Sequence, residues 1–256
     1  EIRVAQGFYT PDLGFLPDED TEEEHGIRES TFRLDDNIII RGGYAGVYAD
    51  DPNAQDYKLY KTILSGDLNR NDIDVNTPND LIEDVSREDN CFHIITCDSN
   101  SIIDGFVITG GRANGEQTST EINYDRRGCA LYNTGSPTIL NCTFIWNYAS
   151  EAGGAIYSNG GDLHLTNCVF SYNSASSYGG GLFINNGNSD ITDCYFKNNN
   201  SAYGGGIYCY STNLNLDNCE FIKNIGSTMG GGLFILNKTA TLNNCRFIGN
   251  TAKLYG

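Results

Sequence analysis

A run of oxygen-bearing side chains between residues 67 and 74 is the clearest candidate for metal binding. Asp and Asn recur through it, at Asp67, Asn69, Asn71, Asp72 and Asp74. Ca²⁺ prefers carboxylate and amide oxygens, which a flexible loop can supply. The pattern is not that of an EF-hand, because the glycine expected at its sixth position is absent and Pro78 stands at the twelfth. The run is therefore a candidate calcium site that Glu83 or Asp84 could close, and a metal-free polar loop is the alternative.

Residues suited to acid–base catalysis on a polysaccharide are sparse. The three histidines, His25, His93 and His164, are far apart in the sequence, and none is part of a Gly-His-Gly motif. The carboxylate pairs 35–36 and 50–51 are adjacent, whereas glycoside hydrolysis needs two carboxylates that face each other across a sugar. The pair 126–127 (Arg-Arg) could bind an acidic sugar, although its partners cannot be placed. The sequence favours a protein without catalytic activity.

A recurring aromatic position offers a second kind of candidate site. Its members are Tyr132, Tyr157, Phe183, Tyr208 and Phe234. Flat aromatic rings in a row could stack against the sugars of an extended glycan. Each ring also follows an aliphatic residue, so the rings could simply cover the wall of the fold. The second interpretation is favoured, and a glycan platform remains the alternative.

These positions belong to a phrase that is repeated five times between residues 128 and 256. The phrase aligns on cysteines that are 26, 26, 25 and 26 residues apart: Cys142, Cys168, Cys194, Cys219 and Cys245. A phenylalanine follows each cysteine by two residues, at Phe144, Phe170, Phe196, Phe221 and Phe247. An asparagine comes three residues later, at Asn147, Asn173, Asn199, Asn224 and Asn250. A fixed period of this length predicts stacked units that each bury an apolar face against the next.

Short runs rich in β-branched and aromatic residues, separated by Gly, Asn and Ser, predict strands. Within one unit the apolar positions are three residues before the cysteine, the cysteine itself and two residues after it. Because strand faces alternate, the chain must bend between the first and second of these positions. The residue before each cysteine is Asn or Asp, which tolerates the left-handed conformation of a tight bend. We therefore predict an all-β fold, a single-stranded parallel β-helix that is right-handed because parallel crossovers almost always are.

Stacked coils should align equivalent side chains along the axis. Asparagine amides in such a column can hydrogen-bond to each other, and the cysteine column forms a file of small buried apolar groups. The chain has nine cysteines, so at least one is free or pairs between chains. Cys91 and Cys97 are the candidate disulfide, with adjacent core positions as the alternative. A zinc site is disfavoured because Cys-x-x-Cys is absent.

The first half of the chain fits the same frame in a degenerate form. In the segment 102–111 (IIDGFVITGG), Phe106 occupies the cysteine position, Ile108 the phenylalanine position and Gly111 the asparagine position. Polar excursions interrupt the coils at 11–30, 46–61, 67–90 and 112–127. We therefore predict one β-helix domain over 1–256, with irregular acidic coils in 1–127 and five regular repeats in 128–256.

The two recurring motifs also resemble a known repeat. Phe-x-x-Asn, paired with Gly-Gly-Ala/Gly-Ile/Leu, is similar to the repeat of polymorphic outer membrane proteins, and similar repeats occur in large β-helical surface proteins of environmental bacteria. The similarity covers about half of the chain, and the first unit departs from it because Cys129 replaces a glycine. The resemblance implies a secreted or cell-surface right-handed β-helix that is often adhesive.

The charge distribution limits the kinds of partner that the protein can bind. The net charge is −17; residues 1–127 carry 27 acids and 11 bases, whereas residues 128–256 carry 6 acids and 5 bases. This excess disfavours nucleic acids and anionic membranes and favours cations. No run of 18 apolar residues that could span a membrane occurs, and because the sequence opens in a strand we expect any signal peptide to have been removed or to lie outside it.

Together these features predict an extracellular or outer-surface structural or adhesive protein. Both ends of the sequence read as interrupted coils, so we expect either that the native chain continues or that another molecule stacks there, which would build fibres by head-to-tail stacking. Glycans or a host surface are the other expected partners. The alternative function is a polysaccharide-binding protein or a polysaccharide lyase that uses calcium.

Overall fold

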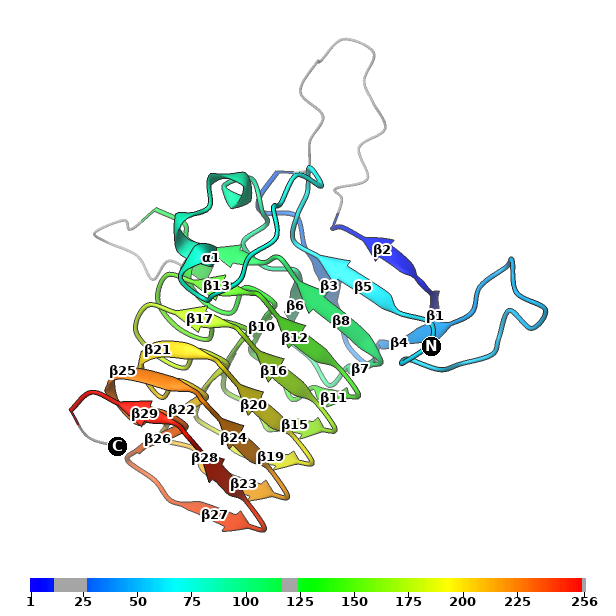
Figure 1. Cartoon of the computed structure of the whole chain (residues 1–256). Coiled ribbons are helices and arrows are strands. Elements are labelled where there is room, and N and C mark those ends of the chain that lie inside the picture. The colour runs from blue at the N-terminus through cyan, green and yellow to red at the C-terminus, as the bar shows by residue number, and fades with distance from the viewer. Residues whose placement is uncertain (12–26, 117–123, 255–256) are drawn as a thin grey trace.

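The computed structural model describes residues 1–11, 27–116 and 124–254, and it is a parallel β-helix of short strands (Figure 1). Four sheets, named A to D here, form its sides. Sheet A contains β1 (Ile2–Ala5), β4 (Ile39–Tyr44), β7 (Ile102–Asp104), β11 (Thr138–Leu140), β15 (Leu163–Thr166), β19 (Asn188–Thr192), β23 (Asn213–Asp217) and β27 (Ala240–Asn243). Sheet B contains β2 (Gly7–Tyr9), β5 (Thr62–Ser65), β8 (Phe106–Thr109), β12 (Thr143–Ile145), β16 (Val169–Ser171), β20 (Tyr195–Lys197), β24 (Glu220–Ile222) and β28 (Arg246–Ile248).

The other two sheets complete each coil. Sheet C contains β3 (Phe32–Leu34), β6 (Ile95–Cys97), β10 (Leu131–Asn133), β14 (Ile156–Asn159), β18 (Leu182–Asn185), β22 (Ile207–Tyr210) and β26 (Leu233–Leu236). Sheet D contains β9 (Arg112–Ala113), β13 (Tyr148–Ala149), β17 (Ser174–Ala175), β21 (Asn200–Tyr203), β25 (Ile225–Met229) and β29 (Thr251–Ala252). The described helices are one turn each: α1 (Asp80–Glu83) and the 3₁₀ helices η1 (Val85–Arg87) and η2 (Tyr124–Arg126).

Strand register places equivalent residues of successive coils beside each other. Every pairing within the four sheets is parallel, and Phe144 pairs with Phe170 as Phe170 pairs with Phe196. The predicted frame of the first half is confirmed, because Ile108 pairs with Phe144 and the amide of Gly111 donates to Oδ1 of Asn147 at 3.1 Å.

The residue before each cysteine forms the predicted left-handed bend. It has positive φ throughout, at Asn141 (52°), Asn167 (54°), Asp193 (54°), Asn218 (52°) and Asn244 (50°). A second left-handed bend, which the sequence analysis did not predict, falls one residue before each ladder asparagine. It occupies Trp146 (57°), Tyr172 (55°), Asn198 (54°), Lys223 (53°) and Gly249 (61°). Side chains at these two bends lie at the two edges of sheet B.

Three columns fill the interior. The phenylalanine rings stack with centroids 4.6–4.9 Å apart from Phe144 to Phe247. In the asparagine column, Asn173 Nδ2 donates to Asn199 Oδ1 at 3.1 Å and Asn199 Nδ2 donates to Asn224 Oδ1 at 3.0 Å. The cysteine column is buried from Cys142 to Cys219, and the amide of Cys168 donates to Sγ of Cys194 at 3.4 Å. The sequence alone therefore located the core correctly.

The candidate disulfide between Cys91 and Cys97 is wrong. All nine cysteines are free, and these two are buried in separate places on the coil. Cys97 ends strand β6 and pairs with Leu34 and Asn133 of the neighbouring coils, whereas Cys91 lies four residues before the start of that strand, so the two are separate core positions. The alternative, in which both are core residues, is confirmed.

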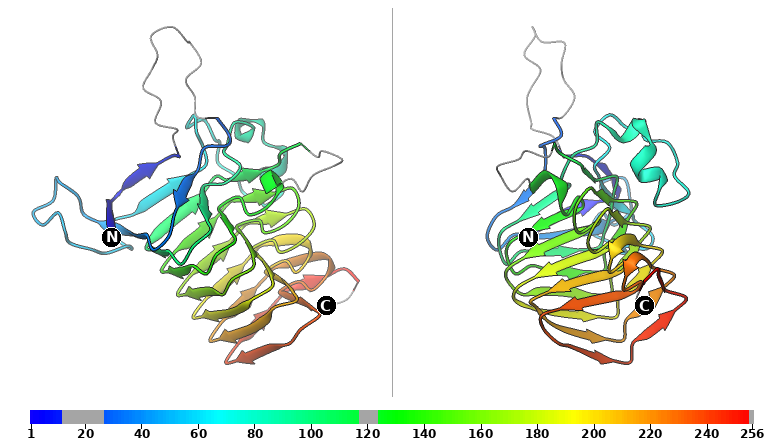
Figure 2. Two further views of the ribbon diagram at one scale, coloured as in Figure 1. Left: turned by 180° about the vertical axis from the view of Figure 1, so that it is seen from behind. Right: turned by 90° about the vertical axis from the view of Figure 1, so that its left-hand side faces the viewer.

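Two described excursions leave the coil near its N-terminal end. Residues 46–61 project beyond the edge between sheets A and B, and residues 67–90, which carry α1, project beyond the edge between sheets B and D (Figures 1 and 2). Because they lie on opposite sides of sheet B, they flank its outward face.

Candidate ligand-binding groove

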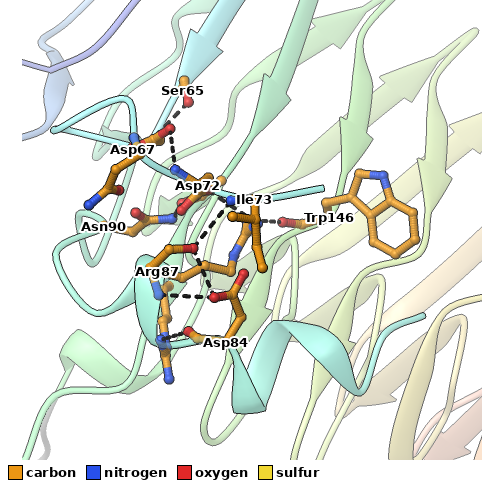
Figure 3. A network of polar contacts seen from close by, with 12 residues as sticks. Ser65, Asp67, Asp72, Ile73, Asp84, Arg87, Asn90 and Trp146 are labelled. Atoms are coloured by element: carbon orange, nitrogen blue, oxygen red, sulfur yellow. Dashed lines mark hydrogen bonds and ion pairs between the residues drawn. The ribbon is translucent and has the colours of Figure 1, made fainter. Parts of the chain in front are cut away.

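The excursion 67–90, named the insertion here, begins with a tightly hydrogen-bonded turn (Figure 3). The amide of Asp67 donates to Oγ of Ser65 at 3.2 Å. The Asp67 carboxylate in turn accepts the amides of Asn71 at 3.0 Å and Asp72 at 3.2 Å. This turn directs the chain away from β5 and brings Asp72 back over the coil.

A buried arginine then attaches the insertion to the wall. Arg87 is 4% exposed; its Nη1 lies 3.1 Å from Oδ2 of Asp72 and its Nη2 donates to the carbonyl of Trp146 at 3.1 Å (Figure 3). On the opposite side, Arg112 of β9 donates to the carbonyl oxygens of Asp84 at 2.9 Å and Ile82 at 3.1 Å. These contacts join the insertion to two adjacent coils, those of β9 and β12.

The electrostatics of this attachment centre on Asp72. Burial raises the pKa of its carboxyl from 3.8 to about 6, and the nearby carboxyls of Asp67 and Asp89 add to the effect. Arg87 and the amide of Asn90 oppose it, since both favour the ionised form. The carboxyl of Asp72 is therefore poised to change its charge in mildly acidic solution.

The outer lip of the insertion is a second rigid turn. Oδ2 of Asp80 accepts the amides of Asn76 at 2.8 Å and Thr77 at 2.9 Å, while Oγ1 of Thr77 donates to Oδ1 of Asp80 at 2.9 Å. These bonds lower the pKa of Asp80, so the carboxylate that shapes the lip stays ionised.

Between this lip and the coil lies a groove with a volume of about 440 Å³. The insertion contributes Asn76, Thr77, Pro78 and Asn79, and the wall contributes Tyr172, Asn198, Asn200, Lys223 and Ile225. Tyr172, Asn198 and Lys223 are successive members of the second left-handed bend, so the helical repeat aligns them along the groove. The groove thus combines one regular wall with one irregular wall.

The wall of the groove offers three kinds of contact. The Trp146 ring stacks on Tyr172 with centroids 4.3 Å apart, which fixes the tyrosine ring against the coil. Asn198 and Asn200 supply amide donors and acceptors. Lys223 is exposed, and in the part of the chain that the structure describes it makes no ion pair. Aromatic surface with a few oriented polar groups is typical of sites that bind small polar molecules and sugars.

The predicted calcium residues do not converge on one point. Asp67 and Asp72 hold the base of the insertion, Asn69 donates to Asp89, and Asn71 and Asp74 are exposed. Among the described residues, no group of three or more His, Cys, Asp or Glu side chains is placed to hold a metal ion. Arg87 already supplies the positive charge beside Asp72. Calcium binding by this run stays a prediction, and it would require the loop to rearrange.

The aromatic column forms a continuous stack whose ring faces cover each other. Centroids are 4.8–5.4 Å apart from Tyr132 to Phe234, and interplanar angles do not exceed 15°. Tyr157 and Tyr208 are 4% and 7% exposed. A glycan platform needs free ring faces, so the stacked geometry favours the other interpretation, in which these rings cover the wall.

Several of the remaining catalytic candidates have structural partners in the described residues. His93 is part-buried, lies near Gly128 O at 3.2 Å, and burial lowers its pKa to about 4. Arg127 pairs with Glu151 and donates to the hydroxyl of Tyr157 at 3.2 Å, so it faces a neighbouring coil. Asp35 pairs with Arg33, and Asp51 accepts the amide of Asn53 at 3.0 Å. His25 and most of the acidic loop 11–30 lie outside the described residues.

The residues of the groove were not predicted from the sequence. Trp146, Tyr172, Asn198 and Lys223 occupy the variable position directly before the ladder asparagine, so the period could have identified them as one outward column. Nothing in the sequence places Asn76–Asn79 opposite that column, because the insertion occurs once and has no repeat to align.

The fold and the groove define a β-helical solenoid that carries a lateral candidate binding groove. Residues 127–255 match the model of the family described as the right handed beta helix region, and the chain belongs to that family. This confirms the predicted hand of the coil, while similarity to the polymorphic outer membrane repeat in particular stays a prediction. No curated protein and no solved structure matches the chain.

None of the helices in the described residues is long and apolar enough to cross a membrane.

Proposed function

We propose that the chain is a secreted or surface-exposed adhesive β-helix that binds an extended polysaccharide in the insertion groove without cleaving it. The observation that carries the proposal is the row Tyr172, Asn198 and Lys223, which faces the lip of the insertion across a space of about 440 Å³. Membership of the β-helix family supports a surface or polysaccharide-related role.

The chemistry of the row suits sugars. An aromatic side chain covers the apolar C–H face of a sugar ring, whereas amides pair with its hydroxyls. The ammonium of Lys223 adds up to three donors that can meet hydroxyl or carboxylate oxygens. Because successive coils are roughly 4.8 Å apart, the three side chains of the row extend over about 10 Å, which is longer than one sugar unit of an extended chain. The row therefore contacts more than one sugar.

Binding to a glycan array, followed by titration with the best ligand, tests the proposal. Tyr172→Ala and Lys223→Gln should each weaken binding at least about tenfold, equivalent to 1.4 kcal/mol or more. Matched controls are Tyr210→Ala on β22 and Lys238→Gln, which are exposed and lie outside the groove. Equal losses in the groove variants and the controls, or no array signal, would contradict the proposal.

The same ligands and variants distinguish this function from the alternative, a polysaccharide lyase that uses calcium. Cleavage would release unsaturated sugar ends from uronic-acid polymers and would require added Ca²⁺. Binding that persists in a chelator with no released product supports the adhesive function. A loss of thermal stability on chelation would instead support the calcium site at 67–74.

End-to-end association is a separate part of the proposal. Leu242, Phe247 and Ile248 of the last described coil are 41–46% exposed, although equivalent residues of earlier coils are mostly more buried. A further coil from this or another molecule would cover them. Sedimentation over a range of concentrations distinguishes a monomer from a stacking species, and electron microscopy would show fibres.

A further inference from the structure

A second cavity lies at the opposite edge of sheet B, beside the excursion 46–61. Its volume is about 370 Å³. The excursion contributes Gln55, Asp56, Tyr57 and Lys58, and the wall contributes Asp104 and Asn141. Asn141 belongs to the first left-handed bend, just as the wall of the groove contains members of the second. Each edge of sheet B therefore carries a cavity between an irregular segment and a column of bend residues.

The excursion holds Tyr57 firmly against the wall. Its backbone is seated on two glycines: a Cβ at Gly43 would lie 2.8 Å from Tyr57 Cα, and one at Gly105 would lie 3.3 Å from Tyr57 Cβ. The amide of Asp56 donates to Gly43 O at 2.8 Å, and Oδ1 of Asp56 accepts the amide of Lys58 at 2.9 Å. The cavity is therefore formed before any ligand binds, which lowers the cost of binding.

A directed row of hydrogen bonds leads along the wall to the Tyr57 hydroxyl. Arg41 Nη1 lies 2.5 Å from Asp104 Oδ2, and Asp104 Oδ1 accepts from Asn141 Nδ2 at 2.7 Å. Because a carboxylate only accepts, Asn141 turns its Oδ1 toward Asn167, whose Nδ2 donates to it at 2.7 Å. Asn167 Nδ2 also donates to the Tyr57 hydroxyl oxygen at 3.3 Å. The hydroxyl hydrogen of Tyr57 has no acceptor among the described residues, so it is left for a ligand.

The charges of this cavity balance. Asp56 and Asp104 are opposed by Lys58 and by Arg41, which pairs with Asp104. Lys58 is exposed and makes no ion pair within the described part of the chain, so its ammonium is a second available donor. Oriented donors without a net charge suit a neutral ligand that is rich in hydroxyl groups.

We infer that the cavity beside Tyr57 is a second carbohydrate subsite, in which sugar hydroxyls accept hydrogen bonds from Tyr57 and Lys58. The two edges of sheet B are separated by the five residue steps from Asn141 to Trp146, which extend over about 17 Å. The residues of β12 that face outward between them, Thr143 and Ile145, are uncharged. A glycan of several sugar units can therefore cross sheet B and occupy both cavities (Figure 1). This crossing rests on the proposed function, whereas the subsite itself does not.

The affinity of sugars of different length tests the subsite. The probes are the trisaccharide and the octasaccharide of the polymer that ranks first on a glycan array, measured by titration calorimetry. Tyr57→Phe removes the hydroxyl and keeps the ring, so the fold should be unchanged, and thermal denaturation checks this. The affinity of the variant for the octasaccharide should fall at least about threefold. The matched control is Tyr48→Phe, a fully exposed residue of the same excursion, which should bind as the wild type does.

Hydrogen–deuterium exchange gives a second measurement that requires no variant. With the octasaccharide bound, amides of 55–58 should exchange at least about threefold more slowly, while those of 47–50 should not change. Unchanged octasaccharide affinity in Tyr57→Phe, an equal loss in Tyr48→Phe, or unchanged exchange in 55–58 would overturn the subsite.

The same titrations separate the subsite from the groove. A loss of affinity in Tyr57→Phe with full affinity in Tyr172→Ala would leave the subsite standing and remove the groove from the proposed function. A loss in Tyr172→Ala alone would leave the groove standing and overturn the subsite. If the wild-type protein binds no glycan, both are wrong.

Discussion

Single residues in this fold are constrained by the coils above and below them. Asn199 is fully buried, and its side chain makes four contacts at once: it donates to Phe170 O at 2.9 Å and Asn224 Oδ1 at 3.0 Å, and it accepts the amide and Nδ2 of Asn173. A side chain with donors and acceptors in this arrangement cannot be replaced by any other natural amino acid without leaving a buried group unpaired.

Asn199→Ala should therefore lower the free energy of unfolding by about 3 kcal/mol or more, because buried groups of two adjacent coils lose their partners. Urea denaturation measures the change. The matched control is Asn215→Ala, an exposed asparagine with one bond, from Nδ2 to Asp190 Oδ1 at 2.8 Å. Its expected loss is below about 1 kcal/mol, and similar losses in both variants would show that the buried ladder is unimportant.

The part-buried histidine His93 leads to a prediction about acid stability. Burial lowers the pKa of His93 from 6.5 to about 4, so the neutral form stabilises the fold fully above pH 6.5, and this contribution is lost as the pH falls through 4. The contribution of Asp72 to stability depends on pH in the opposite direction, because its raised pKa makes that contribution disappear as the pH rises through about 6. Urea unfolding of Asp72→Asn should show declining stability from pH 6.5 to 4.5. The double variant with His93→Gln should show a smaller decline; an unchanged slope would exclude His93 as the cause.

At the scale of the strands and turns, the repeat explains how much could be predicted. The phenylalanine, cysteine and asparagine columns recur in every unit, so a wrong assignment in one unit is corrected by the equivalent positions of the other four. The first bend was predicted because its residues are always Asn or Asp. The second bend escaped notice because it holds Trp, Tyr, Asn, Lys and Gly, which share a conformation but no chemical type. The insertion is unique, and its docking depends on Arg87 and Trp146, 59 residues apart.

Glycines at the corner of sheet D lie where the backbones of neighbouring coils approach each other closely, so substituting them tests this close approach. A Cβ at Gly205 would lie 2.4 Å from Ile225 O and 2.5 Å from Gly231 O, both on the next coil. Gly205→Ala should lower the free energy of unfolding by about 1–3 kcal/mol. Gly249 has a φ of +61°, as Asn198 does at +54°, and a Cβ there would lie 3.6 Å from Lys223 Cγ, an ordinary contact distance. Gly249→Asn should therefore be nearly neutral by thermal denaturation, and a larger loss there than at Gly205 would contradict this account.

The whole molecule shields its thiols. Eight of the nine cysteines are buried and all nine are free; Cys245, in the last described coil, is the partly exposed one. Burial also raises the pKa of Cys142 and Cys219 to about 12, so the reactive thiolate is scarce. The native protein should react with Ellman's reagent at no more than about one thiol, and the remaining thiols should react after unfolding. Rapid labelling of several thiols in the native state would show that the coils open.

The one-coil register of the sheets has a consequence for how such proteins vary over evolution. Each regular coil contacts its neighbours through equivalent residues, so duplication or loss of one unit of 25 or 26 residues preserves every pairing on both sides. The insertion is attached at Trp146 and Gly110, and its groove extends to Lys223 and Ile225, so such changes beyond the coil of Ile225 leave both intact. The number of these coils can therefore change during evolution without a change in the groove.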